Sequence, residues 1–219
     1  MSVAAPPEAA PAVVDRETFA AASGATAAQM ADLDLYLRRL TEGNAVMNLV
    51  GPATLEVFWS RHAWDSAQLA ALEPEALAWA DLGSGAGLPG VVLAILGKHR
   101  PGFHVDLIES VAKRCRFLQA VVDELQLPAT VRNARAEDLA LNVEVATARA
   151  CAPLRRLLGF AEPYLRRGAT GLFLKGQDVA LELEEATRYW DFEADILPSL
   201  SDERGRIVRV RRLRRGRKA

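Results

Sequence analysis

From residue 77 onward, short β-rich runs alternate with amphipathic helical segments, and this alternation restricts the chain to few folds. Repeated strand and helix imply parallel pairing through right-handed crossovers, which predicts an open, doubly wound α/β sheet of about seven strands. The strands are expected at residues 77–82, 103–109, 129–133, 145–150, 170–176, 190–197 and 206–213. Helices are expected at 88–97, 111–125, 153–166 and 178–189, with a short turn near Glu137. The brief connection between the last two strands predicts an antiparallel hairpin.

The segment before the alternating region has two parts. Residues 1–24 are rich in Ala and Pro and poor in large apolar side chains, so we expect a mobile tail. Residues 25–73 are expected to form a helical extension, with one helix from Thr26 to Gly43 and another over 54–72. The α/β domain would then span residues 74–213, and a basic tail would occupy 214–219.

Length and composition favour a single globular domain, which we expect to act as a monomer. The chain has 219 residues, of which 50% are hydrophobic. No apolar run is long enough for a membrane span and the N-terminus lacks an export pattern, so we expect a cytoplasmic protein without membrane partners. Cys115 and Cys151 lie in unrelated contexts, which favours reduced thiols and predicts no metal site.

The charges are distributed unevenly along the chain. From Arg204 to Ala219 there are nine Lys or Arg residues and no acidic residue, although the formal net charge of the chain is −1. A basic end on an acidic body indicates contact with nucleic acid. A tail that only increases solubility would have the same composition, and both interpretations stay open at this point.

The stretch DLGSGAGLPG, Asp81 to Gly90, directly follows the first expected strand. Glycine lets a ligand approach the backbone, and nucleotide-like cofactors bind at this edge of an open α/β sheet. Glu109 ends the second strand, where a carboxylate accepts hydrogen bonds from ribose hydroxyls. A dinucleotide-binding motif read as GAGLPG would begin at Gly85, two residues after Gly83, the first glycine of the loop. Because Asp81 suits a cationic ligand, the pattern favours S-adenosylmethionine.

Several motifs are more specific than the glycine loop alone. They are RHAWDS (61–66), DLGSGAGLPG (81–90), IESVAKRCRFL (108–118), ARA (148–150) and FLKG (173–176). Together they resemble the bacterial 16S ribosomal RNA guanine-N7 methyltransferases, also called the glucose-inhibited division protein B family. The resemblance implies a Rossmann-like class I methyltransferase with an N-terminal helical extension. It also implies a guanine in the 530 loop of 16S ribosomal RNA as substrate, in free RNA or in the small ribosomal subunit.

The loop and the resemblance together predict the site residues. Cofactor contacts are expected at Gly83, Ser84, Gly85, Leu88, Glu109, Ala136, Glu137 and Arg149. Arg149 and Lys175, at the ends of two neighbouring strands, are expected to position the RNA. His62 and Asp65, one helical turn apart, would either orient the substrate or form a structural pair that joins the extension to the sheet. Glu109 stands where the family often has Asp, and its longer side chain can still reach a ribose.

The expected chemistry needs no general base. Guanine N7 carries a lone pair and no proton, so methyl transfer requires alignment and desolvation. Three other functions fit parts of the pattern: a cytosine-C5 methyltransferase with Cys151 as nucleophile, a dinucleotide-dependent oxidoreductase, and a non-enzymatic RNA-binding module. The proline that normally precedes the cysteine of a C5 enzyme is absent here.

Overall fold

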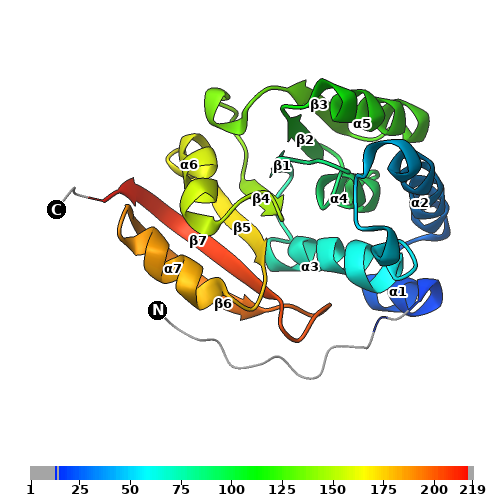
Figure 1. Cartoon of the computed structure of the whole chain (residues 1–219). Coiled ribbons are helices and arrows are strands. Elements are labelled where there is room, and N and C mark those ends of the chain that lie inside the picture. Colours follow the sequence, from blue (N-terminus) through cyan, green and yellow to red (C-terminus); the bar gives the residue numbers. More distant parts are fainter. Residues whose placement is uncertain (1–12, 14, 217–219) are drawn as a thin grey trace.

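The computed structural model describes residue 13 and residues 15–216. Across these residues the chain forms a seven-stranded sheet in the order β3-β2-β1-β4-β5-β7-β6 (Figure 1). The strands are β1 (Ala78–Leu82), β2 (His104–Glu109), β3 (Ala129–Asn133), β4 (Val145–Arg149), β5 (Thr170–Lys175), β6 (Trp190–Pro198) and β7 (Arg206–Arg215). The first five pair in parallel, and β7 is antiparallel to both β5 and β6. The doubly wound sheet and its terminal hairpin are thus confirmed.

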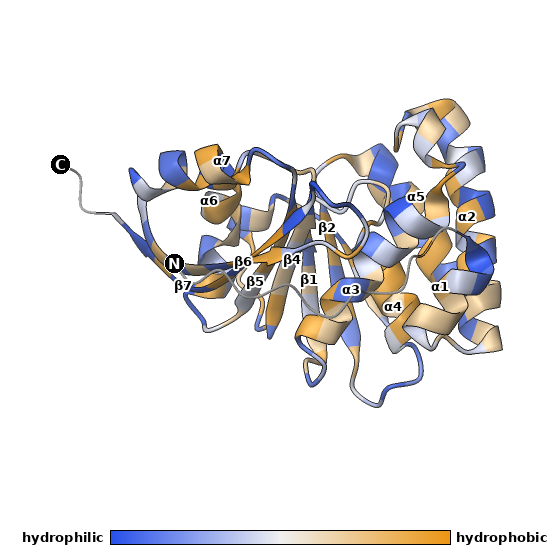
Figure 2. Ribbon diagram, turned by 90° about the horizontal axis from the view of Figure 1, so that it is seen from below, coloured by the Kyte–Doolittle hydropathy of each residue, from blue (hydrophilic) through white to orange (hydrophobic). Residues whose placement is uncertain are grey.

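Helices cover both faces of the sheet, and each face has its own apolar core. On one face lie α4 (Gly90–Gly97) and α5 (Ala112–Leu125), together with the N-terminal helices. On the other face lie α6 (Leu154–Leu165) and α7 (Val179–Thr187), while a short 3-10 turn, Ala136–Asp138, follows β3. Figure 2 shows the sheet between these two helical layers. This arrangement buries both faces of the parallel strands, as α/β sheets require.

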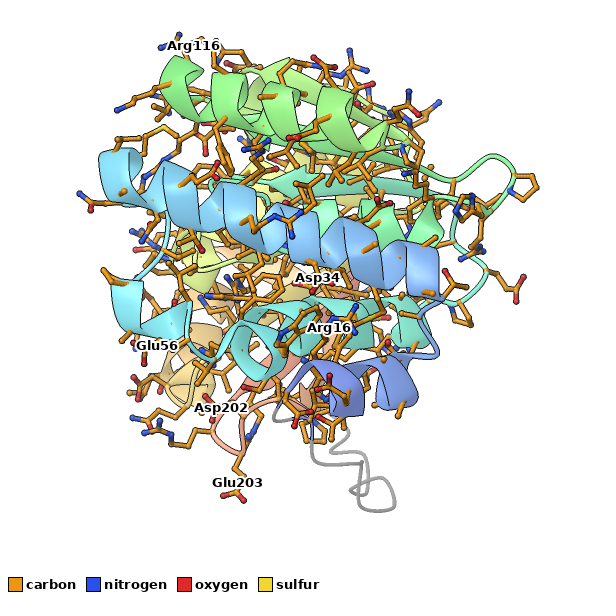
Figure 3. The ribbon with its side chains drawn as sticks, turned by 90° about the vertical axis from the view of Figure 1, so that its right-hand side faces the viewer. Arg16, Asp34, Glu56, Arg116, Asp202 and Glu203 are labelled. Carbon is orange, nitrogen blue, oxygen red and sulfur yellow. The ribbon has the colours of Figure 1, made fainter. Side chains whose placement is uncertain are left out.

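The start of the chain differs from the expected mobile tail. Residues 1–12 and 14 lie outside the described residues, but Arg16–Ser23 form helix α1. Asp15 and Thr18 form a reciprocal capping box at its first turn, and Phe19 is fully buried. The Arg16 side chain donates at 2.8 Å to Asp34 of the next helix, α2 (Ala27–Met47), and Figure 3 shows the two side chains facing each other. Capping and one buried aromatic ring therefore order this helix despite its Ala-rich composition.

Helix α2 (Ala27–Met47) continues past Gly43, where the sequence predicted its end. A Cβ atom at Gly43 would lie 2.9 Å from the Phe117 ring of α5. The glycine is therefore used for close helix packing and not as a terminator. Near the middle of α2, the Tyr36 hydroxyl donates to the Ala86 carbonyl at 2.9 Å, so the extension supports the glycine loop directly.

The segment expected as one helix over 54–72 is divided. It consists of a 3-10 turn (Pro52–Thr54), a π-helix (Trp59–Trp64) and helix α3 (Asp65–Leu72). A π-helical segment inserts extra backbone in a turn and is frequent at functional sites. Here it carries Arg61 and His62 to the C-terminal edge of the sheet. None of the helices in the described part of the chain is long and apolar enough to span a bilayer.

Candidate cofactor and RNA site

A cavity of about 650 Å³ opens at the C-terminal ends of β1, β2, β4 and β5. Its size is typical of small-molecule sites, and its position is the usual ligand crevice of an open α/β sheet. One side is formed by the glycine loop and the end of β2. The other side is formed by the π-helix, α3, the ends of β4 and β5, and the connection between β6 and β7.

The glycine loop presents bare backbone to this cavity. Gly83 and Gly85 have positive φ angles of 72° and 56°, which disfavour residues with a Cβ atom. A Cβ atom at Gly83 would lie 2.5 Å from the Cys151 sulfur, so that position is filled. At Gly85 the nearest atom would be the Gly83 carbonyl oxygen at 3.8 Å. A side chain at Gly85 would therefore project into open space that the cavity offers to a ligand.

Glu109 lies at the end of β2 with its side chain almost fully buried. One carboxylate oxygen accepts from Gly85 N at 3.0 Å and the other from Val111 N at 2.8 Å. Each oxygen retains a further lone pair for a ligand hydroxyl. The open turn at Gly85 and this carboxylate fit the ribose and the adjoining part of S-adenosylmethionine. Ser84 and Leu88 also line the cavity, and their contact with the cofactor stays a prediction.

Asp81 does not line the cavity, which differs from the role its charge suggested. It is fully buried, and its carboxylate accepts from Gly90 N, at the start of α4, at 3.1 Å. Burial raises the pKa of this carboxyl to about 7. The N-terminus of α4 is thus occupied by a protein carboxylate where a dinucleotide pyrophosphate would bind. Asp81 therefore argues against a bound dinucleotide because it occupies the place of the pyrophosphate. It does not do so by contacting a cationic ligand.

Arg149 ends β4 and faces the cavity, as predicted. Its guanidinium Nη1 lies 3.3 Å from Asp65 Oδ2 and donates to the Arg61 carbonyl at 3.1 Å. The next residue, Ala150, has a positive φ of 49°, a conformation that costs energy for any residue with a Cβ atom. The chain therefore turns sharply at the cavity wall, with Arg149 on one side of the turn and Cys151 on the other.

Lys175 ends β5 and also lines the cavity. Its ammonium group lies 2.6 Å from Glu182 of α7 and donates to the Ala152 carbonyl at 3.0 Å. Ala136 and Glu137, by contrast, are not part of the lining. The Ala136 carbonyl accepts from the Tyr164 hydroxyl at 2.8 Å, which ties this turn to α6. Contact of these two residues with the cofactor stays a prediction.

His62 and Asp65 both reach the cavity but do not bond each other. The Thr54 hydroxyl donates to Gly51 O at 2.7 Å, so the proton in its 2.9 Å bond with His62 must come from His62 Nε2. Burial, reinforced by Arg149 and Arg61, lowers the pKa of His62 to about 3. The imidazole is therefore neutral. Asp65, through Arg149, supplies the link between extension and sheet that the pair was expected to form.

Sequence reasoning missed the connection between β6 and β7. Ser199, Asp202 and Gly205 from this segment line the cavity, together with Arg206 at the start of β7. Asp202, labelled in Figure 3, lies 3.1 Å from Arg61 of the π-helix. The segment PSLSDERG is rich in turn-forming residues, and its partners are far away in the sequence, so no local signal marked it as part of the site.

The basic C-terminal region is engaged in ion pairs. Arg209 lies 3.1 Å from Asp195, Arg212 lies 3.2 Å from Glu193, and Arg215 lies 2.8 Å from Glu162. Strand β7 runs to Arg215, beyond the predicted boundary at 213, while Arg217 and Lys218 fall outside the described residues. Contact of this region with RNA stays a prediction. Within residue 13 and residues 15–216, no group of three or more His, Cys, Asp or Glu could hold a metal ion.

Comparison with known sequences gives a consistent result. A family model described as GidB, rRNA small subunit methyltransferase G, matches residues 29–206. The chain is 62% identical to ribosomal RNA small subunit methyltransferase G of Caulobacter vibrioides, with 93% of this chain and 94% of the relative covered. It is 52% identical to the protein of that name from Methylorubrum extorquens, with 84% and 89% covered.

Solved structures share the fold at low sequence identity. A mutant of MtNAS in complex with S-adenosylmethionine superposes with a TM-score of 0.55 at 16% identity, over 91% of this chain and 84% of that one. A protein of the NADB-Rossmann superfamily from Streptococcus agalactiae gives a TM-score of 0.50 at 17% identity, over 68% and 67%. These similarities confirm the Rossmann-like architecture.

Proposed function

Because the chain belongs to the rRNA small subunit methyltransferase G family, it is an S-adenosylmethionine-dependent methyltransferase of 16S ribosomal RNA, and we propose guanine N7 in the 530 loop as its acceptor. We expect it to work in the cytoplasm as a monomer, on RNA or on the small ribosomal subunit. The cytosine-C5, oxidoreductase and binding-module alternatives are not favoured by this family membership.

One observation carries the proposal: the two sides of the cavity differ in chemistry. The glycine loop and Glu109 offer backbone and a hydroxyl acceptor, whereas the facing side carries Arg149 and Lys175. A donor of methyl groups fits the first side, and the O6 edge of guanine or a phosphate fits the cations of the second. Bound S-adenosylmethionine supplies an electrophilic methyl group on its sulfonium.

The residues of this chain then have positioning roles. Gly83, Ser84, Gly85, Leu88 and Glu109 hold the cofactor, and Arg149 and Lys175 hold the guanine or its phosphate. Because N7 has a free lone pair, no residue needs to remove a proton. Alignment alone can contribute on the order of 7 to 11 kcal/mol when two reactants are held in line. The neutral His62, whose pKa is lowered by burial and by Arg149 and Arg61, agrees with a mechanism in which no side chain takes up a proton.

The test is to identify the methylated atom. The protein is incubated with methyl-labelled S-adenosylmethionine and either purified 16S RNA or small subunits that lack the modification. N7-methylguanine is then located by borohydride reduction and aniline cleavage of the RNA. Cleavage at one guanine of the 530 loop supports the proposal. Labelling of a cytosine, or label that does not sensitise the RNA to aniline, would overturn the N7 assignment.

A further inference from the structure

Helix α3 holds the connection between β6 and β7 through two side chains, Asp65 and the buried amide of Gln68. Gln68 is 3% exposed, and its side-chain oxygen accepts from Leu200 N at 2.8 Å. Its nitrogen donates to Ser199 Oγ at 3.1 Å. A single side chain thus fixes both the backbone and a hydroxyl of a segment more than 130 positions away in the sequence.

The same connection reaches Arg149 through Asp65. The Ser201 hydroxyl donates to Asp65 Oδ1 at 2.8 Å, and Gln68 Nε2 lies 3.2 Å from that oxygen. The second oxygen, Oδ2, lies 3.3 Å from Arg149 Nη1. With one oxygen held by Ser201 and Gln68, Asp65 can present the other to Arg149 in only a narrow range of orientations. Helix, connection and strand end therefore meet at one carboxylate.

Hydrogen bonds, rather than apolar burial, hold this connection in place. Its apolar residue Leu200 remains 36% exposed, and the segment from Ser199 to Gly205 is otherwise polar or glycine. Segments with few buried apolar contacts open at low cost in free energy. Loss of the Gln68 amide would therefore loosen the connection at Ser199 and Leu200, next to the Ser201 contact with Asp65, although the ion pair of Asp202 with Arg61 remains.

We propose that Gln68 is a positioning residue for methyl transfer: through Ser201 and Asp65 it keeps the Arg149 guanidinium fixed at the cavity wall. The inference rests on the proposed role of Arg149 in holding the RNA substrate. Small displacements of a positioning group lower the rate of an aligned reaction strongly, without a matching loss of ligand affinity. The residue itself is not in the cavity lining.

The first test compares Gln68→Met with Gln119→Met. Methionine keeps the length of the side chain and removes both hydrogen-bonding groups. Gln119 contacts Asp123 on the exposed face of α5 and is the matched control. We expect Gln68→Met to lower kcat about tenfold to 100-fold, with the KM for S-adenosylmethionine unchanged and Gln119→Met at wild-type values. A lower melting temperature with an unchanged kcat would show that Gln68 is only structural.

The second test uses Ser201→Ala and a double-mutant cycle. Ser201→Ala removes one hydroxyl on the connection, leaves α3 intact, and should lower kcat several-fold. In an Arg149→Lys background, Gln68→Met and Ser201→Ala should each have a much smaller effect, because the group they position is altered. Full additivity would overturn the inference. If Arg149→Lys alone retained full activity, the proposed function of Arg149 would fail instead, and the two failures are distinguishable.

Discussion

The two sides of the cavity are built in different ways. The cofactor side consists of backbone that follows β1 and β2, and its key contact joins Glu109 to Gly85, which lie 24 positions apart at the ends of two consecutive strands. The RNA side is the wall with Arg149 and Lys175, which we propose to hold the RNA. It consists of side chains from the extension, from β4 and from the β6–β7 connection, joined at Asp65. The first side is fixed by strand ends and turns. The second depends on long-range pairs, so single substitutions should affect the two sides differently.

Substitution of Gly85 by Val should have the largest effect and should affect cofactor affinity. The branched side chain would occupy the open space beside the turn, so we expect affinity for S-adenosylmethionine to fall at least about 100-fold. Gly24→Val is the matched control, because Gly24 also has a positive φ, of 66°, with nothing within 4 Å of an added Cβ atom. Calorimetry that showed the same loss for both variants would attribute the effect to backbone strain alone.

Replacement of Arg149 by Ala tests the other side. We expect kcat to fall about 100-fold because a positioning group is lost. Cofactor affinity should fall less than turnover, although Arg149 is also a predicted cofactor contact. The melting temperature should fall by only about 2–4 °C, since Asp65 keeps its bonds from Ser201 and Gln68. Turnover assays and thermal melts measure both quantities. A large loss of stability with near-normal turnover would make Arg149 a structural ion-pair residue.

The sequence predicted the cofactor side better than the RNA side for a physical reason. Strand alternation and the glycine turn are local patterns, and they predict the strand-end positions from which Gly85 and Glu109 line the cavity. The contacts of Gln68 with Ser199 and Leu200 depend on the folded chain and have no local pattern. Helix α1 was missed although a local signal existed. The Asp15 to Thr18 capping box and Phe19 were hidden by the average Ala and Pro content around them.

Glu109→Gln should have a smaller effect on the cofactor side. Both Glu109 oxygens accept backbone N–H groups, from Gly85 and Val111. A glutamine has only one acceptor oxygen, so its NH2 group would face one of these two N–H donors. We expect cofactor affinity to fall about tenfold. Glu144→Gln is the control, because a single oxygen of Glu144 accepts from both Leu77 and Ala78 at the opposite end of the sheet. That variant should bind cofactor normally in calorimetry, and equal losses in both variants would contradict a local role for Glu109.

Cys151→Ala should have the smallest effect. Cys151 follows β4 and touches the glycine loop at Gly83, so this variant tests the contact between the two sides. The residue is exposed as a whole, but its thiol lies against Gly83, and this partial burial, with the carboxylates of Asp81 and Glu109, raises its pKa. A group with less thiolate than a free cysteine is a poor nucleophile, so the thiol serves as packing beside the turn. We expect turnover and cofactor affinity within about twofold of wild type, because only one sulfur atom in van der Waals contact is removed. A cytosine-C5 enzyme would lose its covalent intermediate and all activity. Loss of methyl transfer by a folded, cofactor-binding Cys151→Ala variant would therefore overturn the N7 mechanism and return the thiol to the chemistry.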